Sequence, residues 1–258
     1  MVWICLLLLQ TPDGMQGLAD THTFQHSWND TKYFVHVRLP PQLEKGRKYP
    51  TVYLLDGGIT YPLLASFSHY LQLGEEIPPV ILVGLSYGSD RYEDGNVRSR
   101  DYTAPSTERE NWGGASNFAD MLERELIPLI ERRFPSDSKK RIIFGNSLGG
   151  QFVLYCALFR SDLFWGHIAS NPALHRNLPF FMATETPEGD PMRGYLYVSS
   201  AANDQPRFRE PAVAWMAHIS NQRQLPFRLK TETLDGDTHF SAVPESFRHG
   251  MTWLLQQD

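Results

Sequence analysis

Ser147 lies between two glycines in the run Gly145-Asn146-Ser147-Leu148-Gly149, which has the G-x-S-x-G pattern. In this pattern the serine occupies a strained turn between a strand and a helix, and its hydroxyl stands clear of the sheet. The helix that follows points free N–H groups and partial positive charge at whatever forms on the serine. The pattern predicts a nucleophile whose oxyanion is held by the Leu148 amide. The alternative is a glycine-rich turn whose serine only caps the helix.

A serine nucleophile needs a general base, and in this arrangement the chain order is serine, then acid, then histidine. His239 lies in "LDGDTHFSAVP", a loop rich in Gly and Asp between the last predicted strand and the last predicted helix. Such a loop ends at the same edge of the sheet as the serine turn. The sequence therefore predicts His239 as the general base. Four other downstream histidines fall inside predicted elements or precede every suitable acid: His167, His175, His218 and His249.

An acid that orients the base should follow the seventh predicted strand, where the chain reads "SSAANDQPRFRE". Asp204 is the carboxylate nearer the end of that strand, whereas Glu210 is expected to begin the next helix as an N-terminal acid. Asp235 and Asp237 adjoin His239 in the chain, which makes an orienting bond to the imidazole awkward. Asp204 is the predicted acid, and Glu210 remains the alternative.

A second oxyanion donor is expected in the loop after the third predicted strand, in "LLDGG" (54–58). Glycines let the backbone turn an N–H toward the substrate, so Gly57 or Gly58 is the expected donor. The choice between them stays open, and an ordinary tight turn is the alternative.

The walls of the substrate pocket are expected from "RSRDYTAP" (98–105), from Trp112 and from "NLPFFM" (177–182), which is too short for a large lid. In the first of these segments, Tyr102 would contribute an aromatic wall. Arg98 and Arg100 would meet an anionic or catecholic substrate, or one of them would pair with a nearby aspartate, Asp101 or Asp94, and stiffen the loop.

Strands and helices alternate along the chain, which predicts a mostly parallel eight-stranded sheet with helices on both faces. Strands are expected over 21–28, 32–40, 50–58, 78–88, 141–146, 164–170, 193–200 and 226–234. Helices are expected over 116–134, where Pro128 should bend the helix, and over 149–159, 210–222 and 244–257. The absence of repeats and linkers predicts one catalytic domain over residues 21–258.

The bulk composition is that of a globular chain, with 41% hydrophobic and 21% charged residues among 258. A net charge of −5 without a Lys/Arg block argues against nucleic acid or an anionic membrane as partner. Two cysteines without metal-ligand spacing, and no HExxH, CxxC or GxxxxGK[ST] motif, predict neither metal nor cofactor. Residues 1–20 hold an apolar run too short to span a bilayer, either a cleavable signal peptide or an irregular cytosolic N-terminus.

Several of these stretches together resemble the putative-esterase branch of the α/β-hydrolases, which includes esterase D, feruloyl esterases, mycolyltransferases and trilactone siderophore hydrolases. The matching stretches are "VYLLDGG" (52–58), "ILVGLSYG" (81–88), "RSRDYTAP" (98–105), "GGASNFADMLERELIPLIERRF" (113–134), "GNSLGGQF" (145–152) and "DGDTHFSAVPESFRHGMTWL" (235–254). The "RDYT-P" segment and the "H-x-x-x-x-P" ending are most similar to the siderophore-hydrolase-like bacterial esterases.

The resemblance implies an α/β-hydrolase fold and a serine ester hydrolase without metal or organic cofactor, with the family's nucleophile at Ser147 and its base at His239. Where the family often has a G-x-x-E segment, this chain reads "AAND" (201–204), which leaves Asp204 in the place of the acid. Where the family has "SPS-WW", this chain reads "SNPALHR" (170–176) and lacks the aromatic pair.

The predicted function is a serine carboxylic-ester hydrolase for small or aryl esters, acting through an acyl-enzyme on a small-molecule substrate. One alternative is a hydrolase dedicated to an enterobactin-type trilactone siderophore. Two others are an acyltransferase of the mycolyltransferase kind and a binding module without turnover. The sequence does not determine the oligomeric state or whether the chain is exported.

Overall fold

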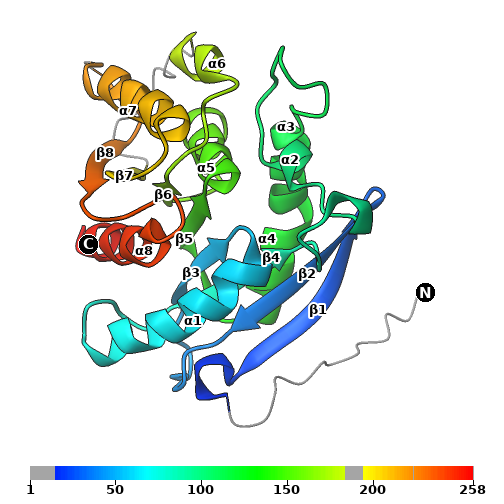
Figure 1. Cartoon of the computed structure of the whole chain (residues 1–258). Helices are drawn as coiled ribbons and strands as arrows, with labels where there is room; N and C mark the ends of the chain where they lie inside the picture. Colours follow the sequence, from blue (N-terminus) through cyan, green and yellow to red (C-terminus); the bar gives the residue numbers. More distant parts are fainter. Residues whose placement is uncertain (1–14, 184–193, 223, 258) are drawn as a thin grey trace.

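A computed structural model describes residues 15–183, 194–222 and 224–257 of the chain, and Figure 1 labels its helices and strands. The predicted N-terminal segment lies mostly outside the described residues. Eight strands of the described part form one sheet in the order β1-β2-β4-β3-β5-β6-β7-β8. Their bounds are β1 (Thr21–Trp28), β2 (Thr31–Arg38), β3 (Tyr49–Leu54), β4 (Ile81–Ser86), β5 (Ser136–Asn146), β6 (Gly166–Ser170), β7 (Tyr195–Ala201) and β8 (Arg228–Leu234).

The sheet is antiparallel only at one edge, where β1 pairs with β2 and β2 pairs with β4. The β1–β2 hairpin turns at Asn29, whose φ of 49° is in the left-handed region that asparagine tolerates. From β4 through β8 all neighbouring strands are parallel. Every residue of β4 and β6 is buried, as expected for strands covered on both faces. Because the parallel strands point the same way, the segments that follow them meet at one edge.

Helices cover both faces of the sheet (Figure 1). The longer ones are α1 (Gly57–Leu73), α3 (Ala115–Met121), α4 (Ile127–Arg133), α5 (Leu148–Phe159), α7 (Pro206–Ser220) and α8 (Ala242–Leu255). The core has two halves, one on each face of the sheet, because successive side chains along β3 and the residue after it point to opposite faces. Val52 and Leu54 pack on the face covered by α1 and α8. Tyr53 and Leu55 pack on the face covered by α3, α4, α5 and α7.

The structure differs from the sequence expectations most clearly after β3. The strand ends at Leu54, just before the expected stop at Asp56-Gly57-Gly58, but the helix α1 that begins at Gly57 was not predicted. Pro62 lies inside this helix and makes the sequence look less helical, because proline removes an intrahelical donor. The expected helix over 116–134 is divided by a π-helical turn at Leu122–Leu126, which ends two residues before Pro128. Wider turns of this kind satisfy backbone groups that proline leaves without a partner.

Candidate active site

Ser147 joins the end of β5 to the start of α5 in a backbone conformation that few non-glycine residues adopt, with φ 60° and ψ −117°. The turn is tight enough that a Cβ at Gly145 would lie 2.4 Å from the Gly149 carbonyl carbon. A Cβ at Gly150 would lie 2.7 Å from the Ser170 oxygen. The glycines around the serine are therefore required by close backbone approach. Ser147 is held in this strained conformation and is only partly buried.

The backbone of the turn is fixed by its neighbours on the sheet. The Ser147 N–H donates to the Ser170 carbonyl at 3.0 Å, and the Ser147 carbonyl accepts N–H groups of Gln151 and Ala173, each at 3.0 Å. These bonds tie the turn to its own helix and to the segment after β6. A strained turn persists only when its surroundings hold it in this way.

His239 and Asp204 form a buried pair, with 2.6 Å between His239 Nδ1 and Asp204 Oδ2. The two residues are 6% and 8% exposed. The second carboxylate oxygen of Asp204 accepts the Gln205 N–H at 2.6 Å, so both oxygens are occupied. A carboxylate only accepts hydrogen bonds, so Nδ1 carries the proton and Nε2 is left as the basic nitrogen.

Two aromatic rings enclose the His239 imidazole. Phe208 stacks on it with 4.7 Å between ring centroids and an interplanar angle of 30°. Phe240 meets it edge-on at 5.1 Å and is itself 77% exposed. The sequence reasoning did not identify Phe208, because nothing in its position three residues into the next helix reveals the ring contact.

A network of asparagines joins the histidine loop to the serine turn. The side-chain amides of Asn146 and Asn171 both donate to the His239 carbonyl oxygen at 3.4 Å. Ser170 Oγ donates to Asn146 Oδ1 at 2.9 Å, and the Ala201 N–H donates to Asn171 Oδ1 at 2.6 Å. The ends of β5, β6 and β7 are thus bonded to the loop that carries His239. The residue immediately before Ser147 contacts the backbone of His239.

The loops that carry Asp204 and His239 are also bonded to each other. The Asn203 N–H donates to the Asp237 carbonyl and the Ala202 N–H donates to the Leu234 carbonyl, each at 2.9 Å. These bonds extend the pairing of β7 and β8 beyond their last residues. They fix the separation of the two loops that supply the carboxylate and the imidazole.

The turn between β3 and α1 begins a helix, so its first backbone N–H groups have no intrahelical acceptor. Asp56 has a left-handed backbone with φ 53°, and its carbonyl accepts the N–H groups of Ile59 and Thr60. The N–H groups of Gly57 and Gly58 come before these two at the start of the helix, where no intrahelical acceptor exists. This turn adjoins α5, because a Cβ at Gly149 would lie 3.5 Å from Asp56 Oδ2.

Arg98 is held by Asp56 through two hydrogen bonds, from Nε at 2.6 Å and from Nη2 at 2.7 Å. The expected partner of an arginine in this segment was Asp101 or Asp94. Arg100 does bond Asp101, at 2.8 Å, and reaches Thr31 at 2.9 Å. Both arginines are therefore occupied within the protein, and the structure does not support their expected contact with an anionic substrate.

Tyr102 is 0% exposed, so it does not form the pocket wall expected from the sequence. Its hydroxyl instead accepts the Asp56 N–H at 3.3 Å, beneath the turn that carries the two glycines. Burial and the Asp56 carboxylate raise the pKa of Tyr102, so the hydroxyl stays protonated. Trp112 is half-buried in the loop before α3.

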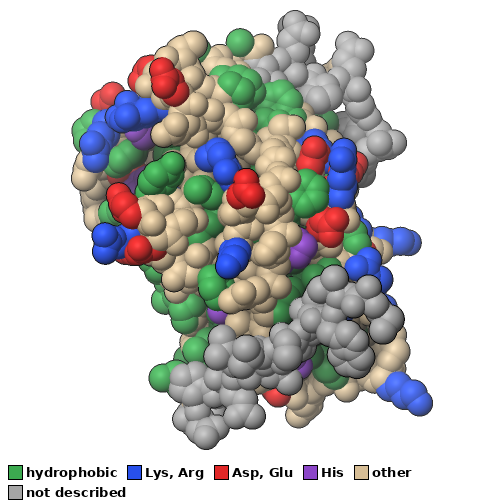
Figure 2. All heavy atoms as spheres, turned by 90° about the vertical axis from the view of Figure 1, so that its right-hand side faces the viewer, with side chains coloured by type: hydrophobic (Ala, Val, Ile, Leu, Met, Phe, Trp, Pro, Cys, Tyr) green, Lys and Arg blue, Asp and Glu red, His purple; other side chains and the backbone are tan. Residues whose placement is uncertain are grey.

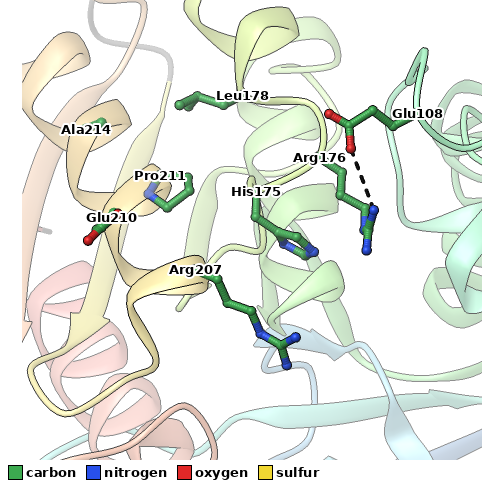
Figure 3. Close-up of a pocket in the computed structure, with 8 residues that line it drawn as sticks. All are labelled: Glu108, His175, Arg176, Leu178, Arg207, Glu210, Pro211 and Ala214. Carbon is green, nitrogen blue, oxygen red and sulfur yellow. Dashed lines mark ion pairs between the residues drawn. The ribbon is translucent and has the colours of Figure 1, made fainter.

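An open pocket of about 550 Å³ lies between the first half of α7 and the segment after β6 (Figure 3). It is lined by Glu108, His175, Arg176, Leu178, Arg207, Glu210, Pro211 and Ala214. His175, which lines the pocket, meets Phe208 edge-on at 4.9 Å, and Phe208 in turn stacks on His239. Glu210, the alternative acid, lines this pocket, whereas His239 is paired with Asp204.

Among the described residues, no three His, Cys, Asp or Glu side chains are grouped so as to hold a metal ion. In the same residues, no helix has the length and apolar character needed to cross a membrane. Figure 2 shows acidic and basic side chains interspersed over the described surface that faces the viewer.

The sequence was compared with known proteins. Residues 27–253 match the family described as "Putative esterase". The ferri-bacillibactin esterase BesA of Bacillus subtilis is 31% identical over 248 residues, which cover 88% of this chain and 86% of the relative. The apo-salmochelin esterase of Escherichia coli O6:H1 is 30% identical over 164 residues, which cover 60% of this chain and 51% of the relative.

The fold is similar to that of a solved IroE-like serine hydrolase from Shewanella oneidensis, with a TM-score of 0.79 at 21% identity. The match covers 92% of this chain and 80% of the solved one. Together with the strand order and the two helical layers, this likeness confirms the predicted α/β-hydrolase fold.

Proposed function

The chain belongs to the putative esterase family and is an ester hydrolase, and from this premise we propose that Ser147, His239 and Asp204 are its catalytic triad. The observation that carries the proposal is the buried 2.6 Å bond between the imidazole of His239 and the carboxylate of Asp204. It gives the imidazole one defined tautomer, with Nε2 as the base, at the edge of the sheet where the serine turn lies.

In the first half of the proposed reaction, Ser147 Oγ attacks the ester carbonyl carbon while His239 Nε2 takes the hydroxyl proton. Asp204 holds the ring and stabilises the imidazolium that forms. The proton then passes to the alcohol oxygen as its bond to the acyl carbon breaks. In the second half, water activated by His239 attacks the acyl-enzyme and releases the acid.

The oxyanion of both tetrahedral intermediates is proposed to be held by the Leu148 N–H together with that of Gly57 or Gly58. One donor of this kind contributes roughly 3–4 kcal/mol to stabilising the transition state. The αL backbone of Asp56, which starts α1 at the two glycines, supports this role for the turn.

Replacement of the nucleophile tests the proposal directly. Ser147→Ala should lower kcat for 4-nitrophenyl acetate by at least ~10⁴-fold, because the covalent route is lost. Ser138→Ala is the matched control, since it removes an exposed hydroxyl from the start of the same strand, β5. Turnover by Ser147→Ala within tenfold of the unsubstituted protein would remove the enzyme assignment from this site.

Small or aryl esters are the proposed substrates, with a siderophore trilactone as the second candidate. The second candidate is favoured by relatives named as esterases of ferri-bacillibactin and apo-salmochelin. A panel of nitrophenyl esters of graded chain length, a ferulate ester and a catecholate trilactone separates the two. A preference of kcat/KM for the trilactone would identify the dedicated hydrolase. We further propose that residues 21–258 act as one domain, since a single sheet holds strands from β1 to β8.

A further inference from the structure

The pocket in Figure 3 lies near His239, because its lining residue His175 meets Phe208, which stacks on the His239 imidazole. The histidine returns its proton to the departing alcohol oxygen, so this oxygen must lie within hydrogen-bond reach of His239 Nε2. The carbonyl oxygen points the other way, toward the backbone donors at Leu148. The pocket adjoins the residues around the imidazole, since Phe208 contacts both His175 of the pocket lining and His239.

Arg207 brings a positive charge to this pocket. Its guanidinium carbon lies 4.4 Å from the Phe208 ring centroid. Within the described part of the chain, no carboxylate forms an ion pair with it. Glu210 lies one turn further along α7, and Figure 3 shows its side chain pointing away from Arg207. Arg207 is exposed, and Figure 3 shows its side chain extending below His175, so its N–H donors are available to a ligand.

Arg176 is a second cation of the same pocket, and it is partly neutralised by a carboxylate. Arg176 lies 3.6 Å from the Glu108 carboxylate, and both side chains are partly exposed, so the pair is weak. Burial, followed by the charges of Arg176 and Arg207, lowers the pKa of His175, which is therefore neutral at pH 7. The neutral imidazole of His175 still offers an N–H donor beside the two guanidinium groups.

We propose that this pocket binds a carboxylate on the alcohol part of the substrate, with Arg207 as its main contact, so that the preferred substrates are esters of hydroxy acids. The inference rests on the proposed function and narrows its substrate class. During acylation the bond from the acyl carbon to the alcohol oxygen breaks, the bond from that carbon to Ser147 Oγ forms, and the proton held by His239 passes to the alcohol. The hydroxy acid leaves with its carboxylate unchanged.

The test uses two esters that differ only in this charge, 3-acetoxybenzoate and its methyl ester. Both give the same acetyl-enzyme, so their kcat/KM ratio reports the alcohol part alone. Arg207→Gln should lower the ratio, carboxylate over methyl ester, by roughly tenfold, the size expected when one charge-assisted hydrogen bond at an exposed site is lost. Glu108→Gln should raise the ratio, because it frees Arg176. Arg132→Gln removes an exposed arginine at the end of α4 and should leave the ratio unchanged.

Three outcomes distinguish failure of this inference from failure of the proposed function. If the protein hydrolyses the methyl ester and Ser147→Ala abolishes this turnover, the proposed function holds. If the function holds but Arg207→Gln leaves the ratio of carboxylate to methyl ester unchanged, the inference about the pocket is overturned. The inference is also overturned if the protein prefers a carboxylate only on the acyl part of the ester. The kcat/KM of phenyl hemisuccinate relative to phenyl methyl succinate measures that preference.

Discussion

Two arginine-bearing regions flank Ser147, and they use their charges in opposite ways. The oxyanion side comprises the β3–α1 turn (54–58) and the segment 98–105, and its arginines are bonded to Asp56 and Asp101. The histidine side comprises the segments after β6 and β7, 171–178 and 202–210. There Arg207 forms no ion pair among the described residues, and Arg176 has only a loose one.

The difference indicates a division of labour along one edge of the sheet. Paired and partly buried charges fix a backbone, because removing either partner leaves the other uncompensated. Exposed unpaired charges contribute little to folding but remain available to a ligand. We therefore expect substitutions on the oxyanion side to damage geometry and stability, and substitutions in the pocket on the histidine side to change substrate choice.

The largest expected effect lies within the histidine side, between its two candidate acids. Asp204→Asn should lower kcat for 4-nitrophenyl acetate by roughly 10³–10⁴-fold, because the imidazole loses its orienting carboxylate. Glu210→Gln should change kcat by less than about threefold, since Glu210 lines the pocket and lies away from the bonded pair. Steady-state kinetics on both variants measures the contrast. Equal losses, or a larger loss for Glu210→Gln, would contradict the assignment of the acid.

The oxyanion side offers the next contrast, between two adjacent glycines. A Cβ at Gly57 would lie 2.5 Å from the Leu85 backbone nitrogen, which cannot move without shifting β4. A Cβ at Gly58 would lie 3.0 Å from Ser86 Oγ, a side-chain atom. Gly57→Ala should therefore lower kcat/KM by roughly 10²-fold through a displaced donor, and Gly58→Ala by less than about tenfold. A Gly58→Ala variant with the greater loss would reverse the roles of the two positions.

The three residues of the proposed triad could be picked out from the sequence because such chemistry constrains residue type, chain order and position after a strand. Ser147 follows β5, Asp204 follows β7 and His239 follows β8, so parallel strands bring all three to one edge. The partners that hold this edge could not be predicted in the same way. Asn171 acts through a left-handed backbone, with φ 41°, and through contacts to two other loops that no local pattern specifies.

The roles of the arginines were harder to predict for a related reason. Arg98 and Asp56 are separated by 42 positions, and no spacing rule connects residues so far apart. The neighbouring pair of Arg100 and Asp101 could be foreseen because the two are adjacent. A sequence shows which residues carry charge, whereas the fold decides which of those charges are neutralised. This is why we propose Arg207, and not Arg98 or Arg100, as the contact of an anionic substrate group.

Loss of an arginine should destabilise the protein more on the oxyanion side than on the histidine side. Arg98→Met leaves Asp56 without its bidentate partner, and we expect the free energy of unfolding to fall by about 2 kcal/mol, less than for a fully buried pair because the side chains are 30% and 22% exposed. Arg207→Met should change it by less than about 0.5 kcal/mol, as is usual at surface positions. Urea denaturation measures both. Equal destabilisation would remove the structural distinction between the two regions.

The smallest expected effect is a pKa change inside the pocket, and it tests the proximity on which the substrate inference depends. Burial and the charges of Arg176 and Arg207 hold the pKa of His175 below its usual value. Arg207→Gln removes one of these charges, so the imidazolium becomes less costly and the pKa of His175 should rise. NMR titration of the His175 ring measures the change, with Arg132→Gln as the control. A pKa that stays the same in Arg207→Gln would mean that this guanidinium spends its time away from the pocket, where it cannot meet a substrate carboxylate.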